Sequence, residues 1–218
     1  YVVAMTSLII TSYNYGHFLE RCLRSALNQT KPEGGYEVLV IDDASSDGTG
    51  QILKNFEDDI RYVRLEENKG LSYARNLGVK MAKGQFVVFL DADDYVHKDF
   101  LYLERTIMGL NPSLDAVSCD YYFVDERGRH SEYVKGDSRP IACGIMFRKD
   151  LLFRVGLYDE GFIAREEEDL RLRWLENYEI FNIPAALYRY RMHHSNLTKD
   201  ANRMAEGKAR FDEKHKKQ

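Results

Sequence analysis

The chain has 218 residues, with 31 lysines and arginines against 35 aspartates and glutamates, which gives a formal net charge of −4. With 44% hydrophobic residues, a chain of this length can close around one core, so we expect a single domain over residues 1–218. The mild acidity argues against a nucleic-acid partner, and no apolar run approaches the roughly 20 residues of a membrane-spanning helix.

Short apolar runs alternate with helical patterns over the first hundred residues. The runs lie at residues 8–10, 38–41, 60–65 and 86–90. Runs that are apolar throughout are typical of strands covered on both faces. Residues 18–27 repeat apolar side chains every fourth position, which predicts an amphipathic helix. A second helix is expected after a cap among residues 45–47, and a third over residues 71–82, ended by Gly84. This alternation indicates a parallel, doubly wound sheet.

The second half of the chain has a less regular pattern. It predicts strands at 116–124, near 141–147 and at 186–192, a polar turn at 125–129, and a helix from about 166 to 177. Most of residues 199–218 are charged, so we expect a solvated helix or a frayed tail there.

Polar side chains gather where the predicted parallel strands end. The first strand ends in Thr11-Ser12-Tyr13-Asn14, the second in Asp42-Asp43 and the fourth in Asp91-Ala92-Asp93-Asp94. Ligands of open parallel sheets bind beyond these ends. Asp91 and Asp93 could project to one side and hold Mg²⁺ or Mn²⁺, or they could simply cap the following turn. No glycine-rich phosphate loop is present, so another group must neutralise any bound phosphate.

Two later segments could also carry chemistry. Residues 165–174 begin a helix with four acidic side chains, which could supply a general base or could only stabilise the helix dipole. Residues 188–198 contain two arginines and the adjacent His193 and His194. Neighbouring residues of an extended chain point apart, so at most one of these histidines faces a given site. That histidine could bind a metal or a phosphate, or it could lie on the surface.

Taken in order, these segments resemble the inverting nucleotide-sugar glycosyltransferases of family 2, which have the GT-A fold. The resemblance covers residues 7–198 and rests on residues 9–14, 27–30, 40–49, 68–78, 90–94, 155–160, 166–173 and 190–193. It implies an α/β protein with a Rossmann-like, mostly parallel sheet, helices on both faces and a mixed second half. Residues of about 5–105 would form the nucleotide-binding half, 106–198 the acceptor half and 199–218 a C-terminal tail.

The resemblance implies a donor site at the strand ends. Thr11 and Tyr13 would lie under the nucleotide base, with Tyr13 stacking on it, and Asp43 would accept a hydrogen bond from the base. Asn14 belongs to the same expected site. A carboxylate acceptor suits uracil and guanine alike, so a UDP-sugar is expected from family habit, with GDP and dTDP left open.

The resemblance also implies a metal site for Mn²⁺ or Mg²⁺. Asp91 would face the ribose and share the metal site, Asp93 would bind the metal, and His193 would be a further ligand. Arg75 would approach the base or the diphosphate, and Ala92 would line the donor site.

For the general base, alignment with the family places Glu167 where an aspartate is usual, and Glu166 and Asp169 remain alternatives. The base would deprotonate an acceptor hydroxyl that attacks the anomeric carbon, with inversion. The expected enzyme is therefore a hexosyl- or N-acetylhexosaminyltransferase that acts on a glycan or lipid-linked acceptor. Polysaccharide or cell-surface glycan synthesis would be its setting.

Two other functions compete with this interpretation. A catalytically silent nucleotide-sugar-binding domain is one, because Glu-Glu stands where the family has Glu-Asp. The other is a phosphotransferase of the haloacid dehalogenase type, since an apolar strand followed by Asp91 and Asp93 is also its pattern. In that class Asp91 would be a nucleophile on the opening strand, and Thr or Val would replace Tyr95.

The three cysteines, Cys22, Cys119 and Cys143, are odd in number and widely spaced. They fit neither a disulfide framework nor a paired zinc site, which indicates a reducing cytosol. We expect a cytoplasmic protein at the inner face of the membrane, where a lipid-linked acceptor would lie. Peripheral membrane contact and a homodimer are both compatible with the sequence.

Overall fold

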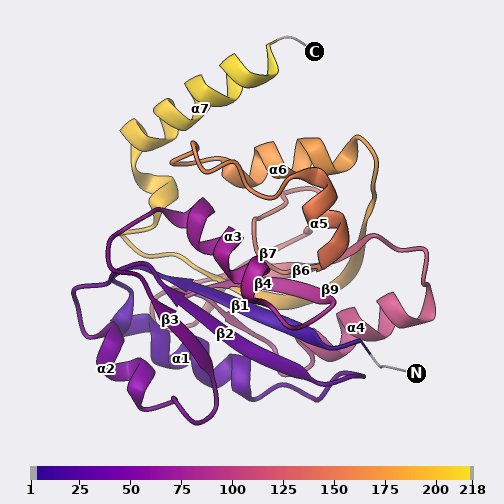
Figure 1. Cartoon of the computed structure of the whole chain (residues 1–218), viewed down its shortest axis with the longest axis horizontal. Coiled ribbons are helices and arrows are strands. Elements are labelled where there is room, and N and C mark those ends of the chain that lie inside the picture. The colour runs from indigo at the N-terminus through magenta and orange to yellow at the C-terminus, as the bar shows by residue number, and fades with distance from the viewer. Residues whose placement is uncertain (1–3, 217–218) are drawn as a thin grey trace.

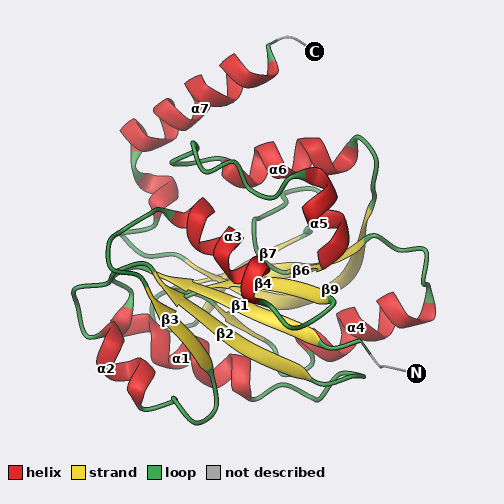
Figure 2. Cartoon of the chain, in the orientation of Figure 1, coloured by secondary structure: helices red, strands yellow, loops and turns green. Residues whose placement is uncertain are grey.

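One mixed sheet of nine strands runs through both halves of the chain in the computed structural model, which describes residues 4–216. Residues 1–3 and 217–218, and with them the outer limits of the predicted domain and tail, lie outside the described residues. Helices cover both faces of the sheet (Figures 1 and 2). The predicted α/β arrangement is confirmed.

The first half of the sheet is parallel, as predicted. It consists of β1 (Thr6–Ser12), β2 (Tyr36–Asp42), β3 (Arg61–Arg64) and β4 (Phe86–Asp91), in the order β3-β2-β1-β4. β1 is buried along its whole length, because strands flank it and helices cover it. The register sets Thr11 opposite both Ile41 and Asp91. The polar strand ends therefore meet at one edge.

The second half of the sheet is mixed, also as predicted. It contains β5 (Tyr95–Val96), β6 (Ala116–Val124), β7 (His130–Val134), β8 (Ile145–Arg148) and β9 (Ile180–Arg191). β8 lies antiparallel between β4 and β6, whereas β9 is parallel to β6. Two boundaries differ from prediction, because β8 starts at Ile145 instead of near Ile141 and β9 starts at Ile180 instead of Ala186. The strands β5 and β7 were not predicted, since β5 has only two residues and four of the five residues of β7 are exposed.

In Figure 1, α1, α2 and α4 lie on one side of the sheet, and α3, α5 and α6 lie on the other. Their bounds are α1 (Gly16–Leu27), α2 (Thr49–Lys54), α3 (Leu71–Met81), α4 (Phe100–Leu110), α5 (Lys149–Val155) and α6 (Glu166–Leu175). Gly48, not residues 45–47, is the cap residue of α2, although the Asp47 carboxylate accepts a hydrogen bond from the Thr49 N–H. The sequence did not predict α4 or α5.

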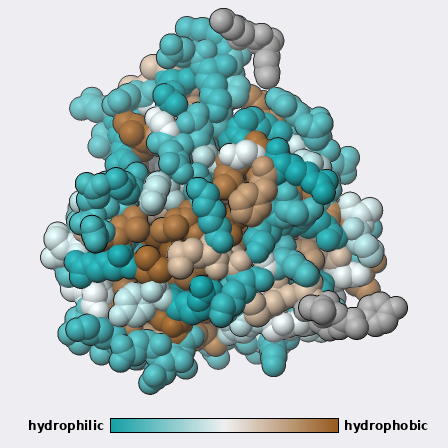
Figure 3. All heavy atoms as spheres, viewed as in Figure 1, coloured by the Kyte–Doolittle hydropathy of each residue, from teal (hydrophilic) through white to brown (hydrophobic). Residues whose placement is uncertain are grey.

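The C-terminal tail forms a short 3₁₀ turn, η1 (Leu197–Lys199), followed by α7 (Ala201–His215). The sequence left a solvated helix or a frayed tail open here, and the structure has the helix. Figure 3 shows mostly hydrophilic residues in the region where α7 lies. One position of α7 is buried, however: Gly207 packs against the loop that precedes α6. Within residues 4–216, no helix combines the length and the apolar character that spanning a bilayer requires.

A glutamate of α4 is enclosed in the core. Glu104 is 0% exposed, and neither carboxylate oxygen has a hydrogen-bond partner among the described residues. Burial raises the pKa of Glu104 well above its usual value, because the charged form loses its hydration and gains no partner. The folded state therefore holds this proton more tightly than the unfolded chain does.

Replacing Glu104 with glutamine should remove a pH-dependent part of the stability. The folded pKa lies above the ordinary value of 4.5, so the stabilising effect of the proton is complete below that value and is lost as the pH rises toward the folded pKa. In urea unfolding, the free energy of unfolding of Glu104→Gln should increase relative to that of the wild type as the pH rises, by about 1–3 kcal/mol at the highest pH. The exposed Glu57→Gln serves as control, and a pH-independent difference for Glu104→Gln would contradict the expectation.

Candidate active site

The carboxyl ends of β1, β2 and β4 open onto a cleft of about 750 Å³, a size typical of small-molecule sites. Ten of the predicted site residues line it: Thr11, Tyr13, Asn14, Asp43, Arg75, Asp91, Ala92, Asp93, Glu166 and Glu167. Two others, His193 and Asp169, do not. Figure 3 shows a band of hydrophobic residues across the middle of the molecule, with hydrophilic borders.

Asp43 organises the end of the cleft at which the base is expected. Its carboxylate accepts hydrogen bonds from the Asn68 side chain (2.9 Å) and from the backbone N–H groups of Lys69 (2.7 Å) and Gly70 (2.8 Å). Gly70 has φ 90°, which glycine adopts without strain. Only one of these three bonds reaches Oδ1, so that oxygen keeps acceptor capacity for a ligand.

Residues at the end of β1 and directly after it surround the same end of the cleft. Thr11 is buried, whereas the Tyr13 side chain is 47% exposed and leaves a ring face available for stacking. Asn14, with φ 58°, fixes the loop after β2: its side-chain oxygen accepts from the Ser46 N–H at 2.8 Å, and its own N–H donates to the Ser45 hydroxyl at 2.9 Å. Asn14 thus shapes the site through the neighbouring loop.

Arg75 joins two parts of the cleft wall that are far apart in sequence. The residue is 1% exposed, and its guanidinium contacts Glu166 Oε1 at 2.8 Å and Asp91 Oδ1 at 3.0 Å. Both acidic partners hold the pKa of Arg75 above its usual value in spite of burial. The guanidinium is already paired with two carboxylates, so we assign Arg75 the role of connecting β4 to α6.

Asp93 and His193 form a buried pair beside this link. His193 Nε2 lies 2.8 Å from Asp93 Oδ2, and its Nδ1 lies 3.0 Å from the Ser195 hydroxyl. Burial, then the nearby charge of Asp91, raises the pKa of Asp93, although the His193 contact opposes this. His193 is buried and the His194 side chain is 89% exposed, as the opposite directions of adjacent side chains predict. His193 therefore acts on the cleft through Asp93.

The donor set at this edge fits a divalent cation. Carboxylate oxygens of Asp91 and Asp93, with an imidazole nitrogen behind them, are ligands that Mn²⁺ accepts, and a cation would offset the repulsion between the two carboxylates. Among residues 4–216, no group of three or more His, Cys, Asp or Glu side chains is placed to hold a metal ion. A cation bound by Asp91 and Asp93 would therefore need water or phosphate oxygens as its other ligands.

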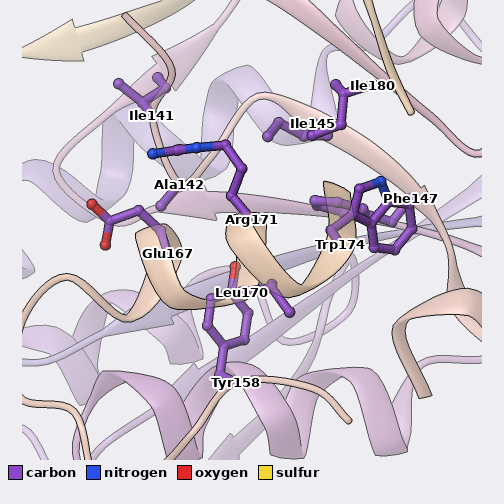
Figure 4. Close-up of a pocket in the computed structure, with 10 residues that line it drawn as sticks. All are labelled: Ile141, Ala142, Ile145, Phe147, Tyr158, Glu167, Leu170, Arg171, Trp174 and Ile180. Carbon is purple, nitrogen blue, oxygen red and sulfur yellow. The ribbon is translucent and has the colours of Figure 1, made fainter. Parts of the chain in front are cut away.

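The first turn of α6 presents two adjacent glutamates to the cleft. Glu166 is held by Arg75, whereas Glu167 has no ion-pair partner among the described residues. Burial, then the charge of Glu166, raises the pKa of Glu167 to about 7. Figure 4 shows Glu167 beside Ile141 and Ala142, with Arg171 one turn further along α6. A carboxylate that titrates near neutrality suits a general base.

Asp169 occupies a different environment from the two glutamates. Its side chain is completely buried and contacts Arg173 of α6 at 2.7 Å and, from α7, Lys214 at 2.8 Å and His215 at 2.9 Å. These partners lower the pKa of Asp169. It does not line the cleft, so the geometry speaks against Asp169 as the base and gives it a structural role between α6 and α7.

The sequence names Asp94 as part of the acidic strand end, whereas it does not single out the α7 residues of the site. Asp94 shapes the acidic turn by accepting hydrogen bonds from the Tyr188 hydroxyl (2.6 Å) and the Arg191 N–H (2.7 Å). Arg203 and Met204 of α7 line the cleft, although the charged tail pattern indicates a solvated helix. The charged pattern of residues 199–218 gives no signal for the place of Arg203 and Met204 at the cleft.

The fold and the cleft place this chain among GT-A-like α/β proteins. The structure of Staphylococcus aureus TarS in complex with UDP-GlcNAc superposes with a TM-score of 0.77 at 24% identity, over 90% of this chain and 61% of TarS. The mannosyltransferase PcManGT from Pyrobaculum calidifontis, in complex with GDP-Man and Mn²⁺, gives a TM-score of 0.74 at 21% identity, over 100% of this chain and 65% of PcManGT.

The sequence model of glycosyl transferase family 2 matches residues 7–165, and the chain belongs to that family, as its motifs predict. Curated relatives include the putative teichuronic acid biosynthesis glycosyltransferase TuaG of Bacillus subtilis, 41% identical over 107 residues (48% of this chain, 42% of TuaG). Another is the uncharacterized glycosyltransferase YibD of Escherichia coli, 36% identical over 155 residues (69% of this chain, 43% of YibD). The chain spans less than half the length of either.

Proposed function

We propose that the chain is a metal-dependent, inverting glycosyltransferase that moves a sugar from a nucleotide diphosphate to an acceptor hydroxyl. The observation that carries the proposal is one cleft lined both by the carboxylates of Asp91 and Asp93 and by Glu167, which has no ion-pair partner among the described residues and whose pKa is raised to about 7. Family membership supports it. UDP-GlcNAc in TarS and GDP-Man with Mn²⁺ in PcManGT support the choice of donor and metal to be tested first.

In this proposal the donor lies along the strand ends. Tyr13 stacks on the base, Asp43 accepts a base N–H through Oδ1, and Asp91 faces the ribose, while Thr11 and Ala92 form the wall. Asp93, with Asp91 and His193 beside it, would hold Mn²⁺ or Mg²⁺, which when bound supplies positive charge to the diphosphate. UDP is the first candidate because a carboxylate acceptor suits the uracil N3–H.

Glu167 is the proposed general base. It takes the proton of the acceptor hydroxyl while the hydroxyl oxygen attacks the anomeric carbon, and the diphosphate leaves from the opposite face with its bonding electrons. The result is inversion. Glu166 and Arg75 fix the turn from which Glu167 projects, so the base is positioned before the acceptor binds.

The acceptor is proposed to enter on the side of the second half of the sheet. Three aromatic residues line that part of the cleft: Tyr121, Phe123 and Tyr190. The centroid of the Phe123 ring lies 5.4 Å from that of Tyr121 and 5.3 Å from that of Tyr190. Aromatic faces suit the apolar faces of sugar rings. We propose a glycan or lipid-linked acceptor handled at the inner face of the membrane; the same proposal holds for a chain acting alone or as a homodimer.

Neither competing function gains support from the site. A silent binding domain has no need of an unpaired carboxylate whose pKa is raised to about 7. In a phosphotransferase Asp91 would be the nucleophile, yet here it is bound by Arg75 at 3.0 Å.

Replacing Asp93 with alanine should abolish metal-dependent nucleotide binding. We expect calorimetric titration of the wild type with UDP, GDP and dTDP to show binding to one of them in Mn²⁺ that EDTA removes. Asp93→Ala should lose it, because the metal loses a carboxylate ligand, whereas Asp58→Ala, an exposed aspartate outside the cleft, should bind normally. If none of UDP, GDP and dTDP binds to the wild type, the proposed function fails.

A further inference from the structure

One cleft-lining cation stands apart from the others. Four arginines line the cleft, and three of them are neutralised by carboxylates: Arg75 by Asp91 and Glu166, Arg139 by Glu132, and Arg165 by Glu168. The fourth, Arg203 of α7, has no ion-pair partner among the described residues. Its positive charge is therefore available to a ligand.

The backbone and side-chain contacts of Arg203 fix its position at the cleft. Its N–H donates to the Asp200 carboxylate that caps α7 (3.0 Å), and its Nε donates to the Ile163 carbonyl (2.6 Å). Neither terminal nitrogen of the guanidinium donates a hydrogen bond within residues 4–216. Nε thus anchors the side chain to the loop before α6, and the two terminal nitrogens of this cleft-lining residue remain available as donors.

A short ordered segment joins Arg203 to the Asp93 and His193 pair. His193 donates its N–H to Asn196 Oδ1 at 2.6 Å, and its carbonyl accepts from Lys199 Nζ at 2.7 Å. Asn196, Leu197 and Thr198 line the cleft between these two points. The segment from His193 to Lys199 therefore leads directly from the proposed metal ligands to the first turn of α7, which carries Arg203.

α7 is clamped onto the loop that leads to the base. A Cβ at Gly207 would lie 2.6 Å from the Ala164 carbonyl, so this close approach requires glycine. Lys214 and Arg210 bind Asp159 at 2.8 Å and 3.1 Å. Because α7 is held at several points, the backbone of Arg203 has a fixed position relative to the cleft.

We propose that Arg203 binds the diphosphate of the donor and, with the metal, completes the phosphate end of the site; this rests on the proposed function. The chain has no glycine-rich phosphate loop, and Arg75 is already neutralised. When the bond between the anomeric carbon and the diphosphate oxygen breaks, its electron pair stays on the diphosphate, whose negative charge grows. Arg203 neutralises that charge, the acceptor oxygen bonds to the anomeric carbon, and its proton passes to Glu167.

The test is calorimetry in Mn²⁺ with UDP, UMP and uridine, or the guanine series if the wild type selects GDP. Arg203→Gln should weaken UDP binding about 10- to 100-fold and leave uridine binding unchanged, because a hydrogen bond to a charged group is lost. Arg203→Lys should restore most of the affinity for UDP, and the salt dependence of UDP binding should become shallower in Arg203→Gln.

Lys208→Gln is the matched control. It removes the same charge from α7, but Lys208 is exposed, pairs with Asp212 on its own helix and does not line the cleft. An unchanged UDP-to-uridine affinity ratio in Arg203→Gln would overturn the proposal, and so would an equal loss in Lys208→Gln. Since the wild type is measured first, failure of the proposed function is seen separately, as absence of nucleotide binding.

Discussion

Replacing Glu167 with glutamine should lower the turnover number for sugar transfer by about 100- to 10,000-fold, the usual contribution of a general base. The amide cannot accept the acceptor proton, yet it keeps the shape of the side chain, so the Kd for the nucleotide should stay unchanged. With a pKa of about 7, Glu167 is protonated in acid, so wild-type activity should rise as the pH passes through that value. The residual activity of Glu167→Gln should not show this rise with pH.

Glu168→Gln makes the same chemical change one residue away. Glu168 pairs with Arg165 and does not line the cleft, so its loss should cost less than about tenfold, as expected for a group outside the reacting centre. Turnover of Glu167→Gln at the wild-type rate, measured with the donor selected by calorimetry, would reject the base assignment. Product analysis by NMR of the anomeric proton in the wild type would test inversion.

Replacing Arg75 with methionine should destabilise the fold by about 3–5 kcal/mol, because it leaves the buried Glu166 and the partly buried Asp91 without their cation. Arg75 is 1% exposed and bridges Asp91 and Glu166, so both acids would have to take up protons or move toward water. Nucleotide binding should weaken in the same variant, since the link between β4 and α6 shapes both sides of the cleft. Urea unfolding and calorimetry measure the two effects.

Arg24→Met is the control for this prediction. Arg24 pairs with Glu20 at 2.7 Å, but both side chains are more than half exposed. Surface pairs of this kind contribute about 0–1 kcal/mol. If Arg75→Met were no more destabilising than Arg24→Met, the buried bridge would not hold the cleft together.

The sequence predicts the first half of the fold well because its signals there are local. Each buried strand is one apolar run, and each polar strand end follows directly in the chain, so parallel pairing alone brings Thr11 beside Asp91. In the second half, β7 is exposed at four of five positions and shows no apolar alternation. Its pairing with β6 depends on tertiary context.

For the candidate site, the sequence and the family resemblance name most of the lining residues but not their partners. The Arg75–Glu166 contact joins residues 91 positions apart, and the His193–Asp93 contact joins residues 100 positions apart. Asp169 could not be separated from Glu167 by spacing, because both lie in one helical turn. The ion pairs of Asp169 with α7 distinguish them, and those exist only in the folded chain.

The close contact between Gly207 and the Ala164 carbonyl has a consequence for how this protein tolerates sequence change. Most positions of α7 face water and place few steric demands on a side chain, whereas any side chain at position 207 would meet backbone atoms. Backbone atoms, unlike the end of a flexible side chain, cannot move away to make room for the added atom. Many exposed positions of this helix can therefore change without a steric conflict, apart from those whose side chains line the cleft or form ion pairs with Asp159 and Asp169. At Gly207, in contrast, even one added carbon atom would push the helix away from the loop before α6.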